Sequence, residues 1–201
     1  MIDTVLRELT DACAALPEVL ALVHGGSRAV GNQDAHSDID LYVYSREPVP
    51  LTARRALIRH RATRMEIGDR FAEESDVWIE RGRGVQVDAI YRPAASFEDH
   101  VTWLLDRFEA RQGNSTAVWH NLLTSRILFD REGWFARLQQ RASRPYPEAL
   151  AQAIIALNVP QLRGAIHSHP HRVALALARG DIVAINEALT CSPATSTFCT
   201  P

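Results

Sequence analysis

Two acids, Asp38 and Asp40, are separated by one apolar residue in the segment 38–45, where polar and apolar residues alternate. Such alternation predicts a strand with one buried face, and both carboxylates lie on the same side of it. Two carboxylates this close repel each other unless a cation lies between them. Mg²⁺ prefers carboxylate oxygens together with substrate phosphates. The pair therefore indicates a metal site.

A third acid, Asp88, belongs to a second segment of the same kind, 85–91. Its side chain faces away from the apolar residues Val85, Val87 and Ala89. If this strand lies beside the first, Asp88 comes next to the first two acids. Three carboxylates suit two-metal phosphoryl transfer, in which ions about 3.5–4 Å apart hold the attacking and leaving oxygens.

A glycine-rich turn precedes the acids. Gly25 and Gly26 follow an apolar run at 19–23, and they allow a sharp turn and a close approach to a ligand. Ser27 is expected to cap a short helix, whose free N–H groups attract phosphate. Arg28 is expected either to contact a phosphate or to be an exposed helix arginine.

These residues resemble a known signature. Gly26-Ser27, then ten residues, then Asp38-Ile39-Asp40, with Asp88 on a later strand, is similar to the nucleotidyltransferase motif of the DNA polymerase β superfamily. The resemblance is strongest to small members, namely minimal nucleotidyltransferases and the enzymes that adenylylate aminoglycosides or lincosamides. It implies an enzyme of the EC 2.7.7 type that transfers a nucleoside monophosphate, AMP from ATP or from another nucleoside triphosphate, to a hydroxyl group.

The resemblance also implies a role for each motif residue. Gly25, Gly26, Ser27 and Arg28 form the nucleotide-binding turn, in which Gly26 and Ser27 hold the β- and γ-phosphates. Asp38 and Asp40 hold the Mg²⁺ that bridges the triphosphate. Asp88 completes a second Mg²⁺ site, and it is also placed to accept the proton of the acceptor hydroxyl.

The sequence leaves three functions open. In the first, the acceptor is a small molecule such as an antibiotic, and in the second it is a protein partner, as in an antitoxin-like nucleotidyltransferase. In the third, the protein is an inactive nucleotide-binding module. The helical remainder of the chain favours the first reading, because a minimal antitoxin needs only about the first 95 residues. A homodimer is also left open.

Composition restricts the function classes. The chain has 201 residues, 46% of them apolar, and a net charge of −2, which argues against nucleic acid as a partner. It has no lysine, which excludes a P-loop lysine, a Schiff base and a lysine general base. No signal peptide or transmembrane stretch is present, so no membrane association and a cytoplasmic location are expected.

The pattern predicts an α+β fold: a small mixed sheet flanked by helices, followed by an all-helical domain. We expect a nucleotidyltransferase domain at 1–93, a helical substrate or partner domain at 94–190 and a disordered tail at 191–201. An arginine-rich helix is predicted at about 51–65, with its arginines on a solvated outer face. Residues 127–130 are predicted to form a short extended link.

Other features are expected to be structural. Cys13 lies on the apolar face of a predicted helix at 2–16 and is expected in the core. The histidine run at 167–171 lacks the spacing of a zinc site and is expected to be a loop. Cys191 and Cys199 could pair, although a cytoplasmic setting argues against a disulfide. The tryptophans Trp103, Trp119 and Trp134 are expected to anchor either the core of the helical domain or its seam with the first domain.

Overall fold

A computed structural model describes residues 2–34, 37–71, 73–111, 116–163, 166 and 168–190. The chain forms two compact units. The first unit comprises Met1–Val101 and Trp119–Arg144, and the second comprises Thr102–Val118 and Pro145–Pro201. The functional division at residue 93 expected above does not coincide with this grouping by contacts, and it remains a prediction.

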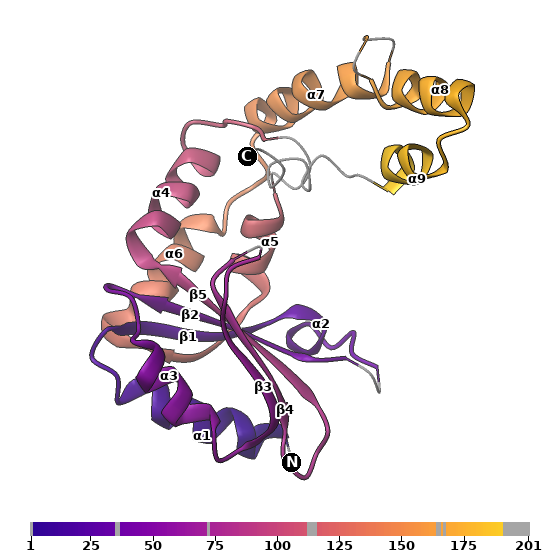
Figure 1. The fold of residues 1–201 in the computed structure, drawn as a ribbon. Helices are drawn as coiled ribbons and strands as arrows, with labels where there is room; N and C mark the ends of the chain where they lie inside the picture. The colour runs from indigo at the N-terminus through magenta and orange to yellow at the C-terminus, as the bar shows by residue number, and fades with distance from the viewer. Residues whose placement is uncertain are drawn as a thin grey trace. The chain divides into compact units, whose positions relative to one another are not determined.

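The first unit is built on a mixed sheet, which has six strands in the described part of the chain (Figure 1). The strand order is β3-β4-β5-β2-β1-β6. β2 and β5 are parallel, whereas the other neighbouring pairs are antiparallel. The mixed sheet and the helices that follow it confirm the predicted α+β class. The strands are β1 (Val19–Gly25), β2 (Ile39–Ser45), β3 (Ala62–Asp69), β4 (Ser75–Glu80), β5 (Gln86–Pro93) and β6 (Arg126–Asp130).

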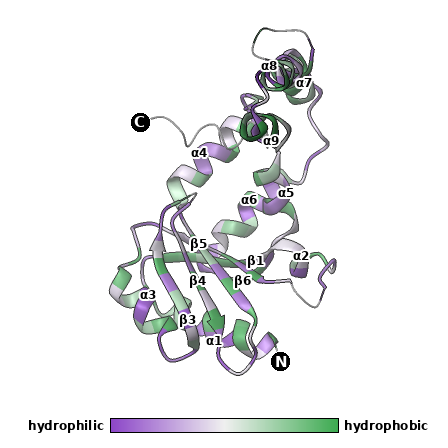
Figure 2. Ribbon diagram, turned by 45° about the vertical axis from the view of Figure 1, so that its right-hand side comes forward, coloured by the Kyte–Doolittle hydropathy of each residue, from purple (hydrophilic) through white to green (hydrophobic). Residues whose placement is uncertain are grey.

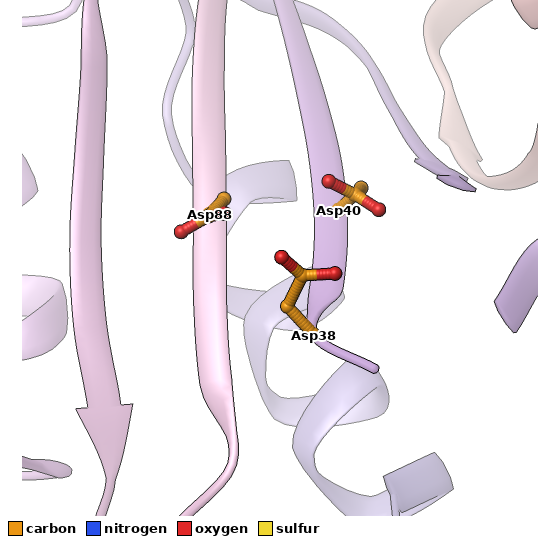
Figure 3. Close-up of side chains that lie close together, drawn as sticks. All are labelled: Asp38, Asp40 and Asp88. Carbon is orange, nitrogen blue, oxygen red and sulfur yellow. The ribbon is translucent and has the colours of Figure 1, made fainter. Parts of the chain in front are cut away.

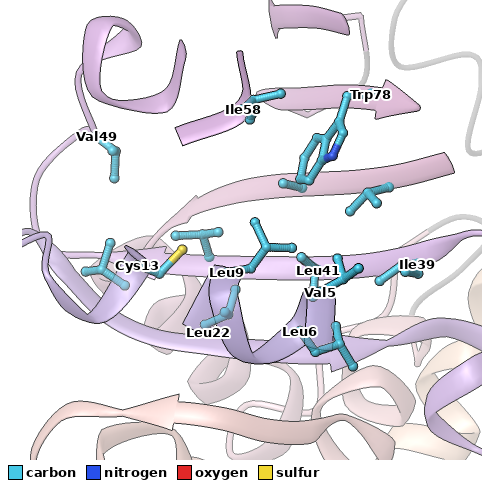
Figure 4. Close-up of a cluster of buried hydrophobic side chains, with 14 of the residues drawn as sticks. Val5, Leu6, Leu9, Cys13, Leu22, Ile39, Leu41, Val49, Ile58 and Trp78 are labelled. Atoms are coloured by element: carbon cyan, nitrogen blue, oxygen red, sulfur yellow. The ribbon is translucent and has the colours of Figure 1, made fainter. Parts of the chain in front are cut away.

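One face of the sheet carries the main core (Figure 4). Helix α1 (Ile2–Ala14) packs its apolar residues against apolar residues of the central strands. They include Leu9 and Cys13, which lies in the core as predicted. Burial raises the pKa of the Cys13 thiol to about 12, so this side chain behaves as an apolar one. Helix α3 (Leu51–Ile58) adds Ile58 to the same cluster.

The opposite face is covered over part of its area by an aromatic cluster. Tyr44 of β2 packs against Phe97 of α4 (Ala94–Leu105) and against Trp134 and Phe135 of α6 (Trp134–Ala142), with ring centroids 4.6 to 5.4 Å apart. Trp134 and Trp119 are buried as expected, but both belong to the sheet unit. This cluster covers the β2 end that lies away from Asp40.

The arginine-rich segment differs from its prediction. The helix α3 ends at Ile58, and 62–69 forms the edge strand β3 in place of the expected last turns of the helix. β3 pairs with β4, which supplies the backbone partners that a helix would have made internally. Arg54 is also not on a solvated face: only 1% of its side chain is exposed, and it pairs with the buried Asp76.

Residues 126–130 also differ from the expected link. They form β6, which pairs with β1 at the sheet edge. The short apolar run gave no sign of which strand it joins, because its partner lies more than a hundred residues earlier in the chain. A 3₁₀ turn, η1 (Arg131–Gly133), leads from β6 into α6.

The second unit is helical. Its helices include α7 (Glu148–Leu162), α8 (His169–Arg179) and α9 (Ile182–Thr190), and α5 (Ala117–Thr124) starts in this unit and continues in the first. His169 begins α8, so residues 169–171 of the histidine run are helical and not a loop. The expected tail with Cys191 and Cys199 lies outside the described residues. None of the described helices is both long and apolar enough to span a bilayer.

Candidate active site

Three acids from two neighbouring strands come together on the sheet face opposite the α1 core. Asp40 of β2 and Asp88 of β5 are direct partners in the parallel register, and Asp38 immediately precedes β2. One carboxylate oxygen from each of the three lies within 4.8 Å of the others (Figure 3). Within the described residues, no other group of acids, histidines or cysteines meets this criterion.

Strand alternation explains why the acids face this way. Ile39 and Leu41 flank Asp40, and Val87 and Ala89 flank Asp88, and all four are buried in the core. Because neighbouring residues of a strand point to opposite faces, burying these side chains sends the carboxylates to the other face. The core therefore fixes the direction of the acids.

Crowding changes the acidity of the cluster. Burial raises the pKa of Asp88 to about 6; the neighbouring Asp38 and Asp40 also raise it, whereas the Gln86 amide, which donates to both carboxylate oxygens at 3.0 and 3.2 Å, lowers it. Burial, followed by the charge of Asp38, raises the pKa of Asp40. These carboxylates are disfavoured as anions while no cation is close, and a divalent cation with oxygen ligands would remove the penalty.

The glycine turn packs directly on the acids. Gly26 has φ +68°, and a Cβ atom at this position would overlap the Asp40 carboxylate. A Cβ at Gly25 would come within 2.5 Å of the Tyr42 ring. Both positions therefore require the close backbone approach that only glycine permits. The backbone of the turn lies against Asp40, on the side of β1.

The two residues after the glycines play other parts than expected. Helix α2 (Gly26–Ala29) has Gly25 as its N-cap and no side-chain cap, so the expected capping by Ser27 is wrong: Ser27 already lies inside the helix. Arg28 donates to the carbonyl oxygens of Ser37 and Asp38 at 2.5 to 2.9 Å. It therefore holds the backbone that carries Asp38.

A shallow hollow of about 290 Å³ lies over β3, β4 and β5. Val77 is the register partner of Asp88 on β4, and Ile79 is the partner of Gln86, so both lie on the face of the acids. Gln86 connects the hollow to the three acids, because it lines the hollow and its amide donates to Asp88. We did not single out Gln86 from the sequence, although its position two residues before Asp88 puts it on the same face.

The floor beside Asp40 includes residues from distant parts of the chain. Burial raises the pKa of the Tyr42 hydroxyl, which accepts a hydrogen bond of 3.3 Å from the Asn121 amide. The Arg92 guanidinium lies 4.4 Å from the Tyr42 ring centroid and is paired with Glu73. Asn121 could not be predicted from a local sequence pattern, because only the tertiary fold brings its helix next to the sheet.

Comparison with known proteins agrees with this site. Residues 6–111, more than half of the chain, match the model of the nucleotidyltransferase domain family. No curated protein matches the sequence. Among solved structures, a nucleotidyltransferase-like protein from Exiguobacterium sibiricum matches with a TM-score of 0.45 and 14% identity, over 94% of this chain and 53% of that one. This chain thus spans about half the length of that protein.

A second solved structure, described as a toxin-antitoxin with AMP-PNP, matches with a TM-score of 0.37 and 13% identity, over 77% of this chain and 92% of that one. The family match covers the glycine turn and both strands that carry the acids. From this match and the motif, the chain belongs to the nucleotidyltransferase domain family of enzymes, within the DNA polymerase β-like superfamily.

Proposed function

We propose that this protein transfers AMP from ATP to a hydroxyl group of a small molecule, such as an antibiotic, and releases pyrophosphate. The observation that supports this most directly is the convergence of Asp38, Asp40 and Asp88 beside the Gly25–Gly26 turn. A triphosphate chelated to a divalent cation needs oxygen ligands and backbone N–H groups within a short distance of each other.

In this proposal the three acids would hold two Mg²⁺ ions, Asp38 and Asp40 one of them and Asp88 the second. The ions would neutralise charge on the triphosphate and polarise the acceptor hydroxyl. The donor set fits, because it is all carboxylate, and burial together with the neighbouring acids raises the pKa of Asp40 and Asp88. Arg28 supports the site by holding the backbone of Asp38, so we assign it a positioning role and no contact with the triphosphate.

The remaining steps belong to side chains and backbone of the chain itself. The turn at Gly25, Gly26 and Ser27 offers backbone N–H groups and a hydroxyl to the β- and γ-phosphates. Asp88 accepts the proton of the acceptor hydroxyl. A carboxylate within hydrogen-bond reach of a metal-polarised hydroxyl can act as its general base.

The acceptor side follows from in-line geometry. The leaving pyrophosphate is placed at the glycine turn, on the β1 side of Asp40, so the attacking oxygen must come from the opposite side, over β5. The hollow over β3, β4 and β5 lies there. Val77 and Ile79 offer an apolar floor, and Arg64, Glu66 and Gln86 offer polar groups, which suits a small molecule of mixed polarity.

A protein acceptor is the second candidate, as in an antitoxin-like nucleotidyltransferase. It is favoured by the apolar side chains that the helical unit leaves exposed. Figure 2 shows α9 in the hydrophobic colour over much of its length. More than half of each of these side chains is exposed: Leu162, Ile166, Leu177, Ile182 and Val183.

The test is a labelling assay with ATP labelled at the α-phosphate, Mg²⁺ and separate pools of hydroxyl-bearing antibiotics and of proteins. Label in the antibiotic pool supports the first candidate, and label in a protein supports the second. Asp40→Asn is the control and must abolish both signals. ATP binding without label in any pool would mean an inactive nucleotide-binding module.

Within an active enzyme, the acceptor side can be tested by Ile79→Arg, which puts a charged side chain into the hollow. We expect the KM for the acceptor to rise while the KM for ATP stays the same. Arg81→Ala, in the turn after β4 and outside the hollow, is the matched control. An unchanged acceptor KM in Ile79→Arg would place the acceptor elsewhere.

A further inference from the structure

A second pocket lies on the other side of the sheet, at the first turn of α1. Its volume is about 220 Å³. Polar side chains dominate its wall, and they come from α1, β1, α2 and its following loop, and β6: Asp3, His24, Arg28, Gln33 and Arg126. His24 shares the sheet face of the core, because its register partner on β2 is the buried Leu41. The pocket is therefore separate from the three acids.

His24 is the unusual member of this wall. Only 4% of the residue is exposed, and neither ring nitrogen has a hydrogen-bond partner among the described residues. Both nitrogens are shielded from solvent, so the ring lies beneath the wall of the pocket that His24 lines, and its resonances would report on a ligand bound there.

The charges around His24 decide which kind of ligand fits. Burial lowers the pKa of His24, and the positive charges of Arg126 and Arg28 lower it further. Two guanidinium groups and one carboxylate, Asp3, give the wall a net positive charge. Arg126 is exposed and makes no ion pair in the described part of the chain. A metal ion is disfavoured here, whereas an anion would be attracted.

We infer that this pocket binds a phosphate group, either free or carried by a small metabolite. The planar guanidinium group of Arg126 matches the geometry of phosphate oxygens, and the Nη1 group of Arg28, which makes no bond to Ser37 or Asp38, adds a further donor. The volume leaves room for a small organic part beside the phosphate. The inference does not depend on the proposed transfer reaction.

Arg28 links the pocket to the acids. The same guanidinium that lines the pocket donates to the carbonyl oxygens of Ser37 and Asp38. The phosphate therefore binds on the rear of the backbone that carries Asp38, while the triphosphate of the proposed reaction binds at the Gly26–Ser27 turn. Because two phosphate-binding places are proposed in one protein, the test must tell them apart.

The test is calorimetric titration of the full chain with inorganic phosphate in metal-free buffer, alongside the ring resonances of His24. We expect binding, a shift of the His24 resonances, and at least about tenfold weaker binding in Arg126→Ala, which loses a charged hydrogen-bond donor. Arg7→Ala, an exposed arginine of α1 outside the pocket, should bind as the wild type does. Thermal unfolding of each variant checks that it is folded.

Further arms identify the site and the ligand. Ser27→Ala should bind phosphate as the wild type does, so loss of binding in Ser27→Ala together with normal binding in Arg126→Ala would overturn the inference. Equal affinity for acetate would overturn the phosphate class. Glycerol phosphate tests for the metabolite form: tighter binding than free phosphate indicates a phosphate ester, and weaker binding indicates the free ion. No binding of either phosphate in the wild type would also overturn the inference.

Discussion

At the scale of single residues, Gly26 and Asp40 depend on each other. The backbone of Gly26 occupies the space in which any side chain would meet the Asp40 carboxylate, and its φ of +68° is one that other residues rarely adopt. The turn that would hold phosphate and the acid that would hold metal are thus in direct contact. A change at one of them must disturb the other.

The first prediction concerns Gly26→Ala. We expect it to lower the free energy of unfolding by about 1–3 kcal/mol and to weaken Mg²⁺ binding, because the new methyl group displaces the carboxylate. The matched control is Gly31→Ala, since Gly31 also has a positive φ (+78°) but nothing lies near its Cβ position. The control should lose about 1 kcal/mol of stability and keep its Mg²⁺ affinity. Calorimetry of both variants measures these effects.

The second prediction is a pH dependence. The pKa of Asp88 in the folded, metal-free protein is about 6, above its ordinary value, so the folded state binds this proton more tightly than the unfolded state. Its contribution to stability is full below pH ~4 and is lost as the pH rises through about 6. The melting temperature of Asp88→Asn relative to the wild type should therefore rise over this range. Asp99→Asn, at an exposed acid, should show no such rise.

At the scale of elements, α3 is fastened to the sheet by a charge pair inside the protein. Arg54 bonds both oxygens of Asp76 on β4, at 2.9 and 2.5 Å, and neither side chain is more than 1% exposed. Asp76 also accepts from the backbone N–H of Gly68 on β3, and Arg54 lies 3.9 Å from the ring centroid of Tyr91 on β5. One arginine thus joins a helix to three strands.

The third prediction follows from this pair. Arg54→Ala should lower the free energy of unfolding by about 3–5 kcal/mol, because it leaves the Asp76 charge buried without a counter-charge. The exposed neighbour Arg55 is the control, and Arg55→Ala should stay within about 0.5 kcal/mol of the wild type. The double variant Arg54→Met with Asp76→Leu should recover part of the loss. Urea denaturation gives all three values; if the single variant Arg54→Ala cost no more than the control, the fastening role would be wrong.

The same helix shows what the sequence could and could not predict. The strands that carry the acids were predictable, because the alternation of polar and apolar residues is a local pattern that depends on nothing else in the chain. Arg54 was not, because its type suggests solvent and its burial depends on an acid twenty-two residues later. The strand β3 was missed for a related reason: only pairing with β4 makes an extended form of 62–69 favourable, and that pairing is not written in the segment itself.

The candidate site divides in the same way. Asp38, Asp40, Asp88 and the glycine turn could be named from types and spacing, and the structure gathers the three acids in one cluster. Gln86 could have been named by the same reasoning, because it lies two residues before Asp88 and therefore on the same face of the strand. Asn121, which donates to Tyr42, and Arg126, which lines the second pocket, lie in the later segment of the first unit, Trp119–Arg144. They come near the central strands only because β6 of this segment pairs with β1.

At the scale of the whole molecule, the two units differ in how well they bury their apolar residues. The sheet unit holds the large core cluster, whereas the helical unit leaves large apolar side chains in solvent. Ile182 and Val183 of α9 are 79% and 69% exposed. Contiguous exposed apolar surface in a folded protein usually marks a place of contact with something else.

The fourth prediction tests this surface. Replacing Ile182 and Val183 together by serine should reduce the binding of a hydrophobic dye and any self-association, with a change in stability within about 0.5 kcal/mol, because neither side chain is in the core. Phe71→Ser, an exposed apolar residue of the sheet unit, is the comparison and should leave self-association unchanged. Light scattering and dye fluorescence give the two readouts. A large loss of stability in the double variant would mean that these residues are packed in solution.

The pairing of β2 with β5 has a consequence for how the chain reaches its folded form. A slip of one residue between them would turn the acids into the core, and burial of charge would reject it. A slip of two residues keeps every side chain on its proper face, yet it would set Asp40 opposite Gln86 or Ile90 and take Asp88 away from it. Apolar burial alone scarcely tells these two alignments apart. A cation bound to the gathered acids would stabilise only the native alignment, so the substrate complex would favour the correct register of β2 and β5.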